Sequence, residues 1–254
     1  MVERARRAGV STFYAPGDWS GEVELGEGAA HHATVKRLAV GEIIGLANGA
    51  GQLADASIVQ LGKRSLRVAV VAGSQHAMAP LPDVELWAPV GDRDRMLWLA
   101  EKATELGVSS WRPVMYQRSR SVTPRGEGEA FRAKVEARMI GALEQSGGAW
   151  LPRRRVECAF EAIVHETPTG ALCVLLHTAG EPIVQALTPN ADGPLVATRV
   201  VIALGPEGGL NEAEVDAFAS RGWRTVSLGP NILRFETAAL AALAAVRTFT
   251  LPRT

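Results

Sequence analysis

Apolar and polar side chains alternate along three short runs in the first 75 residues, at 42–47, 52–61 and 65–72. Alternation with a period of two is typical of a half-buried β-strand. Asn48-Gly49-Ala50-Gly51 and Gly62-Lys63-Arg64 separate the runs and have the composition of hairpin turns. The stretch 12–25 can add further strands, and 31–38 has the pattern of one short helix. Several strands joined by tight turns predict a small β-barrel rather than a nucleotide-binding sheet.

From residue 84 onward, continuous apolar runs alternate with segments of helical periodicity. The runs predict strands at 84–90, 111–115, 171–177, 199–204 and 224–228, and the periodic segments predict helices at 92–106, 127–146, 212–221 and 236–249. In the first helix Met96, Leu99 and Ala103 share one face, and Gly107 ends it. This pattern predicts a parallel α/β sheet covered on both faces. The proline-containing segment 74–82 indicates a linker, so we expect a β-barrel domain at 1–75 and an α/β domain at 83–254.

The composition excludes a global charge bias. The 254 residues include 27 Lys plus Arg and 27 Asp plus Glu, so any nucleic-acid partner must be held by a local patch. Of the cations, 23 are arginines, which fork onto phosphate and stack on bases. The longest purely apolar stretch, 238–246, is far shorter than the roughly 20 residues that span a bilayer. No apolar signal core follows the N-terminal arginines, and we expect a cytoplasmic protein without a membrane partner.

Cysteine and histidine are too scattered to suggest a metal site. Cys158 and Cys173 form no CxxC pair, and the five histidines form no HExxH motif. Both cysteines lie beside apolar residues, as buried free thiols commonly do. The sequence therefore predicts neither a metal nor a disulfide.

A glycine-rich loop follows the apolar run 200–204. Ligands of open α/β sheets bind beyond the carboxyl ends of the strands, and Gly205-Pro206-Glu207-Gly208-Gly209 lets backbone approach a ligand closely. A tight strand-to-helix turn is the alternative, and Asn211 with Glu214 resembles a capping box. The loop matches neither GxGxxG nor a P-loop. Because Glu207 would repel a phosphate, a cationic or neutral ligand fits it better.

Two further turns end apolar strands. Arg234 lies between large apolar residues just before a helix that opens with Glu236 and Thr237. It either pairs with a surface carboxylate, with Glu236 and Thr237 capping the helix, or faces the glycine loop. His177 ends the strand predicted at 171–177, either as a ligand contact or as a residue at the rim of the sheet.

These residues carry a family resemblance. GPEGGLNEAE (205–214) and LGPNILRFETAALAAL (228–243) resemble motifs of the 16S ribosomal RNA uridine-N3 methyltransferases of the SPOUT, trefoil-knotted superfamily. The segment 101–108, Arg118-Ser119 and Glu144-Gln145-Ser146 are similar to further elements of that family, and 31–49 resembles its N-terminal PUA-like barrel. The resemblance covers nearly the whole chain.

The resemblance implies methyl transfer from S-adenosylmethionine to N3 of a uridine in small-subunit rRNA. It also implies a C-terminal SPOUT-type sheet with a trefoil knot and a homodimer with the cofactor beside its interface. By the same resemblance, the cofactor would be held by Leu176, His177, Gly205, Glu207, Gly208, Gly209, Leu228, Gly229, Ile232 and Leu233. Arg234 and Glu236 would lie near the methyl group or the target base.

Uracil N3 carries a proton and is a poor nucleophile until that proton leaves. Arg234 could stabilise the uracil anion at a carbonyl oxygen. A carboxylate such as Glu236 or Glu207 could accept the proton if it were buried. The sequence leaves the choice open, with Arg234 favoured as the anion stabiliser.

Positive residues predict the RNA contacts. They are Lys36, Arg37, Lys63, Arg64, Arg67, Arg118, Arg120 and Arg125, and each would contact phosphate without reading sequence unless it is simply solvated. Two positions depart from the family pattern. Gly148 stands where an arginine is usual, with Arg153-Arg154-Arg155 coming later, and Phe235 replaces a small or hydroxyl residue. RNA contacts can therefore differ here.

Three other functions fit parts of the pattern. Another SPOUT methylation, of ribose 2′-O or a different base, would share the cofactor site. A silent RNA-binding or ribosome-assembly factor would have no need of the intact glycine loop. A dinucleotide enzyme would have an early GxGxxG, which is missing here.

Overall fold

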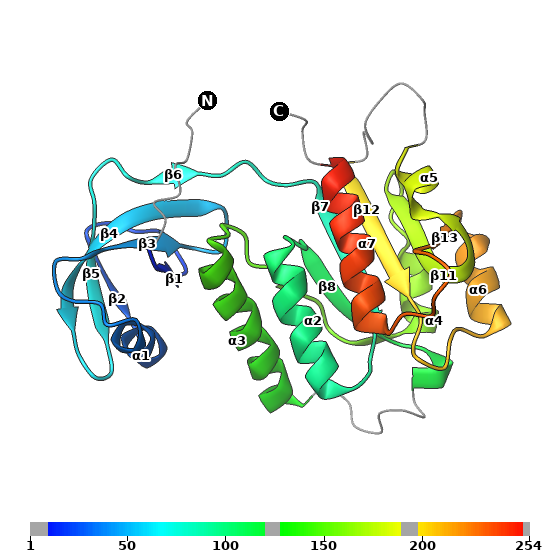
Figure 1. Cartoon of the computed structure of the whole chain (residues 1–254), viewed down its shortest axis with the longest axis horizontal. Coiled ribbons are helices and arrows are strands. Elements are labelled where there is room, and N and C mark those ends of the chain that lie inside the picture. Colours follow the sequence, from blue (N-terminus) through cyan, green and yellow to red (C-terminus); the bar gives the residue numbers. More distant parts are fainter. Residues whose placement is uncertain (1–9, 120–127, 189–197, 251–254) are drawn as a thin grey trace. The chain divides into compact units, whose positions relative to one another are not determined.

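A computed structural model describes residues 10–119, 128–188 and 198–250 (Figure 1). The chain divides into two compact units, Met1–Pro80 with Ile140–Leu151, and Leu81–Met139 with Pro152–Thr254. The division after Pro80 falls inside the predicted 74–82 linker. Residues 140–151 belong to the first unit, although we expected them in the second domain. Within the described ranges, no helix is both long and apolar enough to cross a membrane.

The first unit is a curled, partly open barrel. Its elements are β1 (Thr12–Tyr14), β2 (Glu22–Leu25), α1 (Glu27–Val35), β3 (Ile43–Ala47), β4 (Gln52–Leu61), β5 (Leu66–Val70) and β6 (His76–Ala77). The strand order is β1-β3-β4-β5-β2 with β6 on β4, so β1 and β2 are the unpaired ends of the described sheet. The three alternating runs are confirmed as β3, β4 and β5. Their alternate side chains, such as Ile44 and Leu46, are fully buried.

The helix predicted at 31–38 begins and ends earlier, at Glu27 and Val35. Gly26 precedes it, and Arg37 ends the turn in the left-handed region at φ 57°. A side chain at positive φ cannot continue a right-handed helix. Periodicity alone did not locate this stop.

The Glu-Gln-Ser helix end has a structural role within the first unit. Glu144 Oε1 accepts a hydrogen bond from the Tyr14 backbone N–H at 2.9 Å. Its Oε2 lies 3.2 Å from Nδ1 of His32, which also packs against the Phe13 ring. Glu144 thereby joins β1 and α1 to the end of α3 (Glu129–Ser146), whose expected start at 127 lies outside the described residues.

The second unit contains a seven-stranded sheet in the order β10-β8-β7-β12-β11-β13, with β9 on β8. Its strands are β7 (Asp83–Pro89), β8 (Ser110–Met115), β9 (Arg153–Arg154), β10 (Cys158–Ala159), β11 (Leu172–Pro182), β12 (Arg199–Leu204) and β13 (Arg224–Ser227). All of its pairings are parallel, as predicted. The pairings of β9 and β10 are two residues long, too short for the sequence to reveal.

Helices cover both faces of this sheet. They are α2 (Arg93–Glu105), α4 (Phe160–Ile163), α5 (Ile183–Leu187), α6 (Glu212–Ala219) and α7 (Phe235–Thr250), with short 3₁₀ turns at Gln117–Ser119 and Val164–Glu166. On one face α7 packs on β7 and β12, and α2 packs on α7 (Figure 1). On the other, Trp87 packs with Phe160 of α4 and Phe218 of α6. The covered parallel sheet is confirmed.

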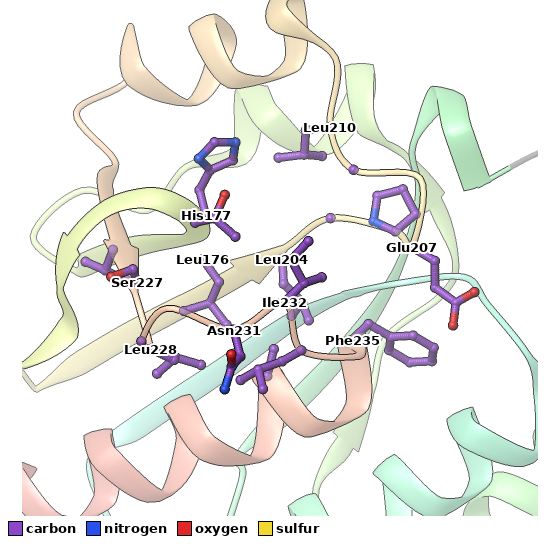
Figure 2. Close-up of a pocket in the computed structure, with 18 of the residues that line it drawn as sticks. Leu176, His177, Leu204, Glu207, Leu210, Ser227, Leu228, Asn231, Ile232 and Phe235 are labelled. Carbon is purple, nitrogen blue, oxygen red and sulfur yellow. The ribbon is translucent and has the colours of Figure 1, made fainter.

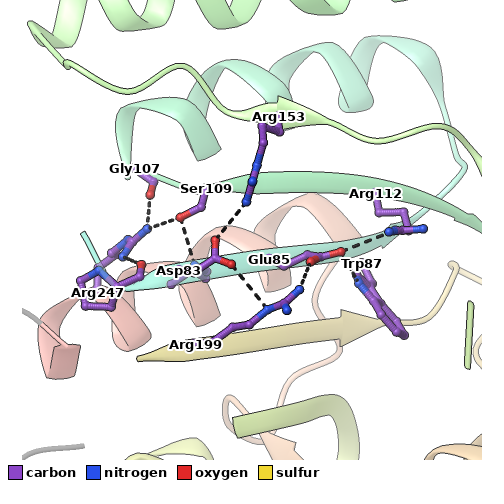
Figure 3. Close-up of polar contacts among 11 residues, drawn as sticks. Asp83, Glu85, Trp87, Gly107, Ser109, Arg112, Arg153, Arg199 and Arg247 are labelled. Carbon is purple, nitrogen blue, oxygen red and sulfur yellow. Dashed lines mark hydrogen bonds and ion pairs between the residues drawn. The ribbon is translucent and has the colours of Figure 1, made fainter. Parts of the chain in front are cut away.

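A network of charges around the buried Glu85 joins the starts of the central strands (Figure 3). Glu85 of β7 is 2% exposed and accepts hydrogen bonds from Arg199 Nη2 and Trp87 Nε1, both at 2.9 Å. Burial alone would raise the pKa of Glu85, but these hydrogen bonds and the charges of Arg112 and Arg199 outweigh it and hold the pKa below its ordinary 4.5. The network therefore favours an ionised Glu85 inside the sheet.

Arg247 joins the end of α7 to the same region. Its guanidinium donates to the Pro82 carbonyl at 2.6 Å and to the Gly107 carbonyl. Burial lowers the pKa of Arg247 to about 10. Glu85 and Arg247 therefore both lie near the amino end of β7. Ligands of such sheets bind at the opposite edge, beyond the carboxyl ends of the strands.

We expect Glu85→Gln to lower the free energy of unfolding by about 1–3 kcal/mol at pH 7, because Arg112 and Arg199 lose their buried counter-charge and keep only their outer partners Glu166 and Asp83. Urea unfolding followed by tryptophan fluorescence measures the change. The folded-state pKa is depressed, so the stabilisation is complete above pH 4.5 and is lost as pH falls through the lower folded value. Glu105→Gln, which touches only an exposed pair with Lys102, should leave the unfolding curve unchanged. Equal losses for both variants would contradict this role of Glu85.

Candidate active site

A pocket of about 380 Å³ opens where β12 and β13 end, beside the middle of β11 (Figure 2). Its walls come from the middle of β11, the loop after β12, the turn after β13 and the start of α7. It is lined by Leu176, His177, Thr178, Leu204, Gly205, Pro206, Glu207, Gly208, Gly209, Leu210, Val226, Ser227, Leu228, Gly229, Asn231, Ile232, Leu233, Phe235 and Ala238. All ten positions predicted to hold the cofactor are among them. Their binding role stays a prediction.

The loop 205–209 has little room for side chains. A Cβ on Gly205 would lie 2.8 Å from Leu210 Cγ, and Gly209 has φ +71°. Arg118 fastens the loop from outside, because its Nη1 donates to the Gly208 carbonyl at 2.7 Å and to the Leu210 carbonyl at 3.3 Å. The glycines therefore allow the tight conformation of the loop and leave its carbonyl groups accessible to Arg118.

The capping box predicted after the loop is confirmed. The Asn211 side chain accepts from the Glu214 N–H at 2.8 Å, and the Glu214 side chain accepts from the Asn211 N–H at 2.9 Å. Glu214 is buried and also accepts from the Gln117 N–H at 2.9 Å. This carboxylate ties α6 to the turn after β8, so the downstream end of the loop is fixed.

Strand β11 continues to Pro182, so His177 does not end it as predicted, but its pairing with β13 shifts register after Leu176. Leu176 and Glu181 are both paired with Val226 of β13, so 177–180 forms a loop above that strand. His177 Nδ1 accepts from the Ala179 N–H at 3.2 Å, and the His177 ring borders the pocket (Figure 2). A Cβ on Gly180 would meet the Val226 backbone at 2.5 Å. Gly180 therefore allows the loop to close on β13.

An ion-pair cluster lies beside the pocket. Glu207 Oε1 accepts from Arg234 Nη1 at 3.1 Å and also from Arg95 Nη1. Arg95 Nε is 3.7 Å from Oε1 of Glu236, whose side chain is only 10% exposed. Among the described residues, Oε2 of Glu236 is buried and has no hydrogen-bond partner. Arg234 and Glu236 do not line the pocket themselves, but this cluster attaches both to its wall.

Arg234 both pairs with a carboxylate and faces the glycine loop, because its partner Glu207 belongs to that loop. The capping of the helix by Glu236 and Thr237 stays a prediction. Sequence reasoning missed Arg95 and Gly180. Arg95 lies in the first turn of the helix after β7, and β7 pairs with β12, so the strand order could have placed it near Glu207. That order is not visible in periodicity. Phe235, which departs from the family pattern, is 4% exposed and packs against Gly91. A Cβ on Gly91 would lie only 2.9 Å from the Phe235 ring.

The predicted RNA contacts are placed as follows. Lys36 and Arg37 are exposed after α1, and Arg64 is exposed in the turn between β4 and β5. Arg118 is exposed but engaged with the glycine loop. Arg120 lies outside the described residues, as does Arg125.

The cysteines are free, and their burial differs from what we expected. Cys173 is buried, and burial raises its pKa to about 11. Cys158 is only half-buried because it lies in the short edge strand β10, and burial again raises its pKa. Neither borders the pocket.

The family model "RNA methyltransferase domain" matches residues 78–247, and the model "RNA methyltransferase PUA domain" matches residues 25–71. The chain belongs to the RNA methyltransferase family. Curated relatives include "Ribosomal RNA small subunit methyltransferase E" of Bacillus subtilis, 27% identical over 87% of both chains. The protein of that name from Mycobacterium bovis is 29% identical over 89% of this chain and 85% of its own.

Solved structures resemble this RNA methyltransferase along nearly its whole length. The Ribosomal RNA small subunit methyltransferase E from Neisseria gonorrhoeae, bound to S-adenosyl methionine, has a TM-score of 0.79 at 27% identity and covers 94% of this chain and 97% of that one. A putative methyltransferase from Legionella pneumophila, in complex with the same cofactor, has a TM-score of 0.79 at 28% identity with the same coverage.

In this RNA methyltransferase we expect Gly180→Ala to lower the free energy of unfolding by about 1–3 kcal/mol, because the new methyl group overpacks against backbone that cannot rotate away. Amide hydrogen exchange around 177–180 and Val226 should speed up. Gly141→Ala is the matched control, since its Cβ meets nothing within 4 Å. It should be neutral or stabilising by up to about 1 kcal/mol. Unchanged exchange in Gly180→Ala would contradict the close contact with β13.

Proposed function

We propose that this RNA methyltransferase transfers the methyl group of S-adenosylmethionine to N3 of a uridine in 16S rRNA of the small ribosomal subunit. The observation that carries the proposal is the pocket itself. The two C-terminal motifs and His177 line it, and an ion-pair cluster lies at its edge. The names of the curated relatives support an rRNA substrate, and the solved relatives support the cofactor. A ribosomal substrate agrees with the expected cytoplasmic location.

The residues of the pocket suit S-adenosylmethionine. Its lining among the described residues includes no Lys or Arg and one carboxylate, Glu207, so it offers a phosphate no counter-charge. Leu176, Leu204 and Leu228 provide apolar surface for an adenine ring, and the glycines expose backbone. Bound here, the cofactor supplies an electrophilic methyl group on a positively charged sulfur that becomes a neutral thioether.

Glu236 receives the proton of the target base in the proposed reaction. Among the described residues its Oε2 is buried and accepts no hydrogen bond, which leaves that oxygen able to take up a proton. As the N3–H bond breaks, the proton passes to this carboxylate. The electron pair left on N3 would then form the bond to the methyl carbon, with the C–S pair retained by the sulfur of S-adenosylmethionine.

Arg234 stabilises the charge that develops on the uracil. Its side chain is 60% exposed and its recorded partner is Glu207, so it can exchange that carboxylate for a uracil carbonyl oxygen. A guanidinium aimed at developing negative charge lowers the barrier without any proton transfer of its own.

The acting form in this proposal is a homodimer. Ile232 is 89% exposed and Leu233 is 38% exposed, although both are large apolar residues that border the pocket. A second copy of the chain would remove this surface from water and complete the site. On the first unit, Lys36, Arg37 and Arg64 supply phosphate contacts that do not depend on sequence.

Calorimetry of the purified protein with S-adenosylmethionine, NAD and ATP tests the cofactor assignment. We expect selective binding of S-adenosylmethionine. Incubation with unmodified small subunits and nucleoside mass spectrometry should then yield 3-methyluridine. Selective binding of NAD or ATP would overturn the cofactor assignment, and a 2′-O-methyl or other product would overturn the N3 assignment.

We expect Glu236→Gln to lower kcat by about 100-fold or more, because the site loses its proton acceptor. The affinity for S-adenosylmethionine should stay within about twofold, since Glu236 does not line the pocket. Transfer of radiolabelled methyl groups to rRNA measures kcat. Glu212→Gln, on the exposed first turn of α6, is the control. A normal kcat in Glu236→Gln would exclude this residue as the proton acceptor.

A further inference from the structure

Arg95 contacts both carboxylates of the cluster from a different element of the fold. It lies in the first turn of α2, where the Asp92 side chain accepts from the Arg95 N–H at 3.1 Å. From there its Nη1 reaches Glu207 Oε1, and its Nε lies 3.7 Å from Glu236 Oε1.

Glu236 depends on Arg95 for its counter-charge. Its side chain is 10% exposed, against 40% for Glu207, so water screens it far less. Among the described residues, Arg95 is the cation recorded within ion-pair distance of Glu236. A buried carboxylate is costly unless a cation compensates it. Arg95 therefore also helps to determine where the acceptor oxygen of Glu236 lies.

Glu207 links Arg95 to Arg234. The same oxygen, Oε1, accepts from both guanidinium groups. The Arg95 side chain is 30% exposed and is anchored on a helix, whereas Arg234 is 60% exposed on an irregular segment. When Arg234 turns toward a substrate, Arg95 can keep Glu207 paired. Arg95 is thus the fixed member of the cluster and Arg234 the one free to exchange partners.

We propose that Arg95 is a positioning residue for methyl transfer. It holds Glu236 where that carboxylate meets the N3 proton, and it keeps Glu207 neutralised while Arg234 moves to the uracil oxygen. This inference rests on the proposed function. In a purely structural role, Arg95 would connect α2 to the glycine loop without affecting the chemical step. A positioning role affects that step.

The variants Arg95→Met, Arg95→Lys and Arg93→Met separate these roles. Arg93 is the matched control, because it lies on the same helical turn but packs over the Phe131 ring at 5.4 Å. We expect Arg95→Met to lower kcat at least tenfold with an S-adenosylmethionine Kd within twofold of wild type. Arg95→Lys should recover part of kcat, and Arg93→Met should resemble wild type. An Arg95→Met enzyme with normal kcat, or one whose loss Arg93→Met reproduces, would overturn the proposal.

A double-variant cycle with Glu236→Gln tests whether Arg95 acts through Glu236. In the Glu236→Gln background, Arg95→Met should cost at most a third of the factor in kcat that it costs in wild type. In the double variant Glu236 is replaced by a neutral side chain, so the loss of Arg95 leaves no unpaired charge at that position. The double variant can therefore be measured even if Arg95→Met alone fails to fold. An equal factor in both backgrounds would overturn the role assigned to Arg95. If wild type makes no 3-methyluridine, the proposed function fails, which is distinct from a wild type that is active and insensitive to Arg95.

Discussion

Strand β7 pairs in parallel with β12, and an ion pair of 2.9 Å between Glu85 and Arg199 joins the two strands near their starts. Parallel pairing brings the carboxyl ends of both strands to one edge of the sheet. The helix after β7 and the glycine loop after β12 therefore meet there, which is why Arg95 and Glu207 touch. A slip in this register would move Arg95 along the edge and separate it from both carboxylates.

Charge is divided between the pocket and its surroundings. Inside, backbone groups and apolar side chains predominate, and the lining among the described residues includes no arginine or lysine. Immediately outside, two arginines and two carboxylates balance each other. A pocket of this kind can hold a positively charged sulfur without competition from a cation. In the proposed reaction Arg234 is the member of this cluster that stabilises the negative charge developing on the base.

Much of the fold could be predicted because the signals are local. Two-residue alternation located β3 to β5, continuous apolar runs located the longer parallel strands, and the Asn211–Glu214 capping box depends only on neighbours along the chain. The ten pocket positions came from the family resemblance, whose motifs lie in strand-end turns. Their arrangement around one pocket is described by the structure, but their binding role remains proposed.

What escaped prediction depends on contacts between distant residues. Arg95 becomes relevant only through the pairing of β7 with β12, and Gly180 only through its approach to Val226. The half-open barrel and the two-residue strands β9 and β10 depend likewise on tertiary pairing. The trefoil knot stays a prediction, because the threading of a chain through a loop has no periodic signal.

The pairing of β7 with β12 also has a consequence for synthesis of the chain. Glu85 and Arg199 are 114 positions apart, so at ribosomal speed β7 emerges on the order of ten seconds before its partner exists. Throughout that interval the edge of β7 that will pair with β12 has no partner. Contacts between residues so far apart in the chain also slow folding. The second unit is therefore the part of this protein that would benefit most from chaperones during translation. Overproduction should expose that need as aggregation of nascent chains rather than as instability of the finished enzyme.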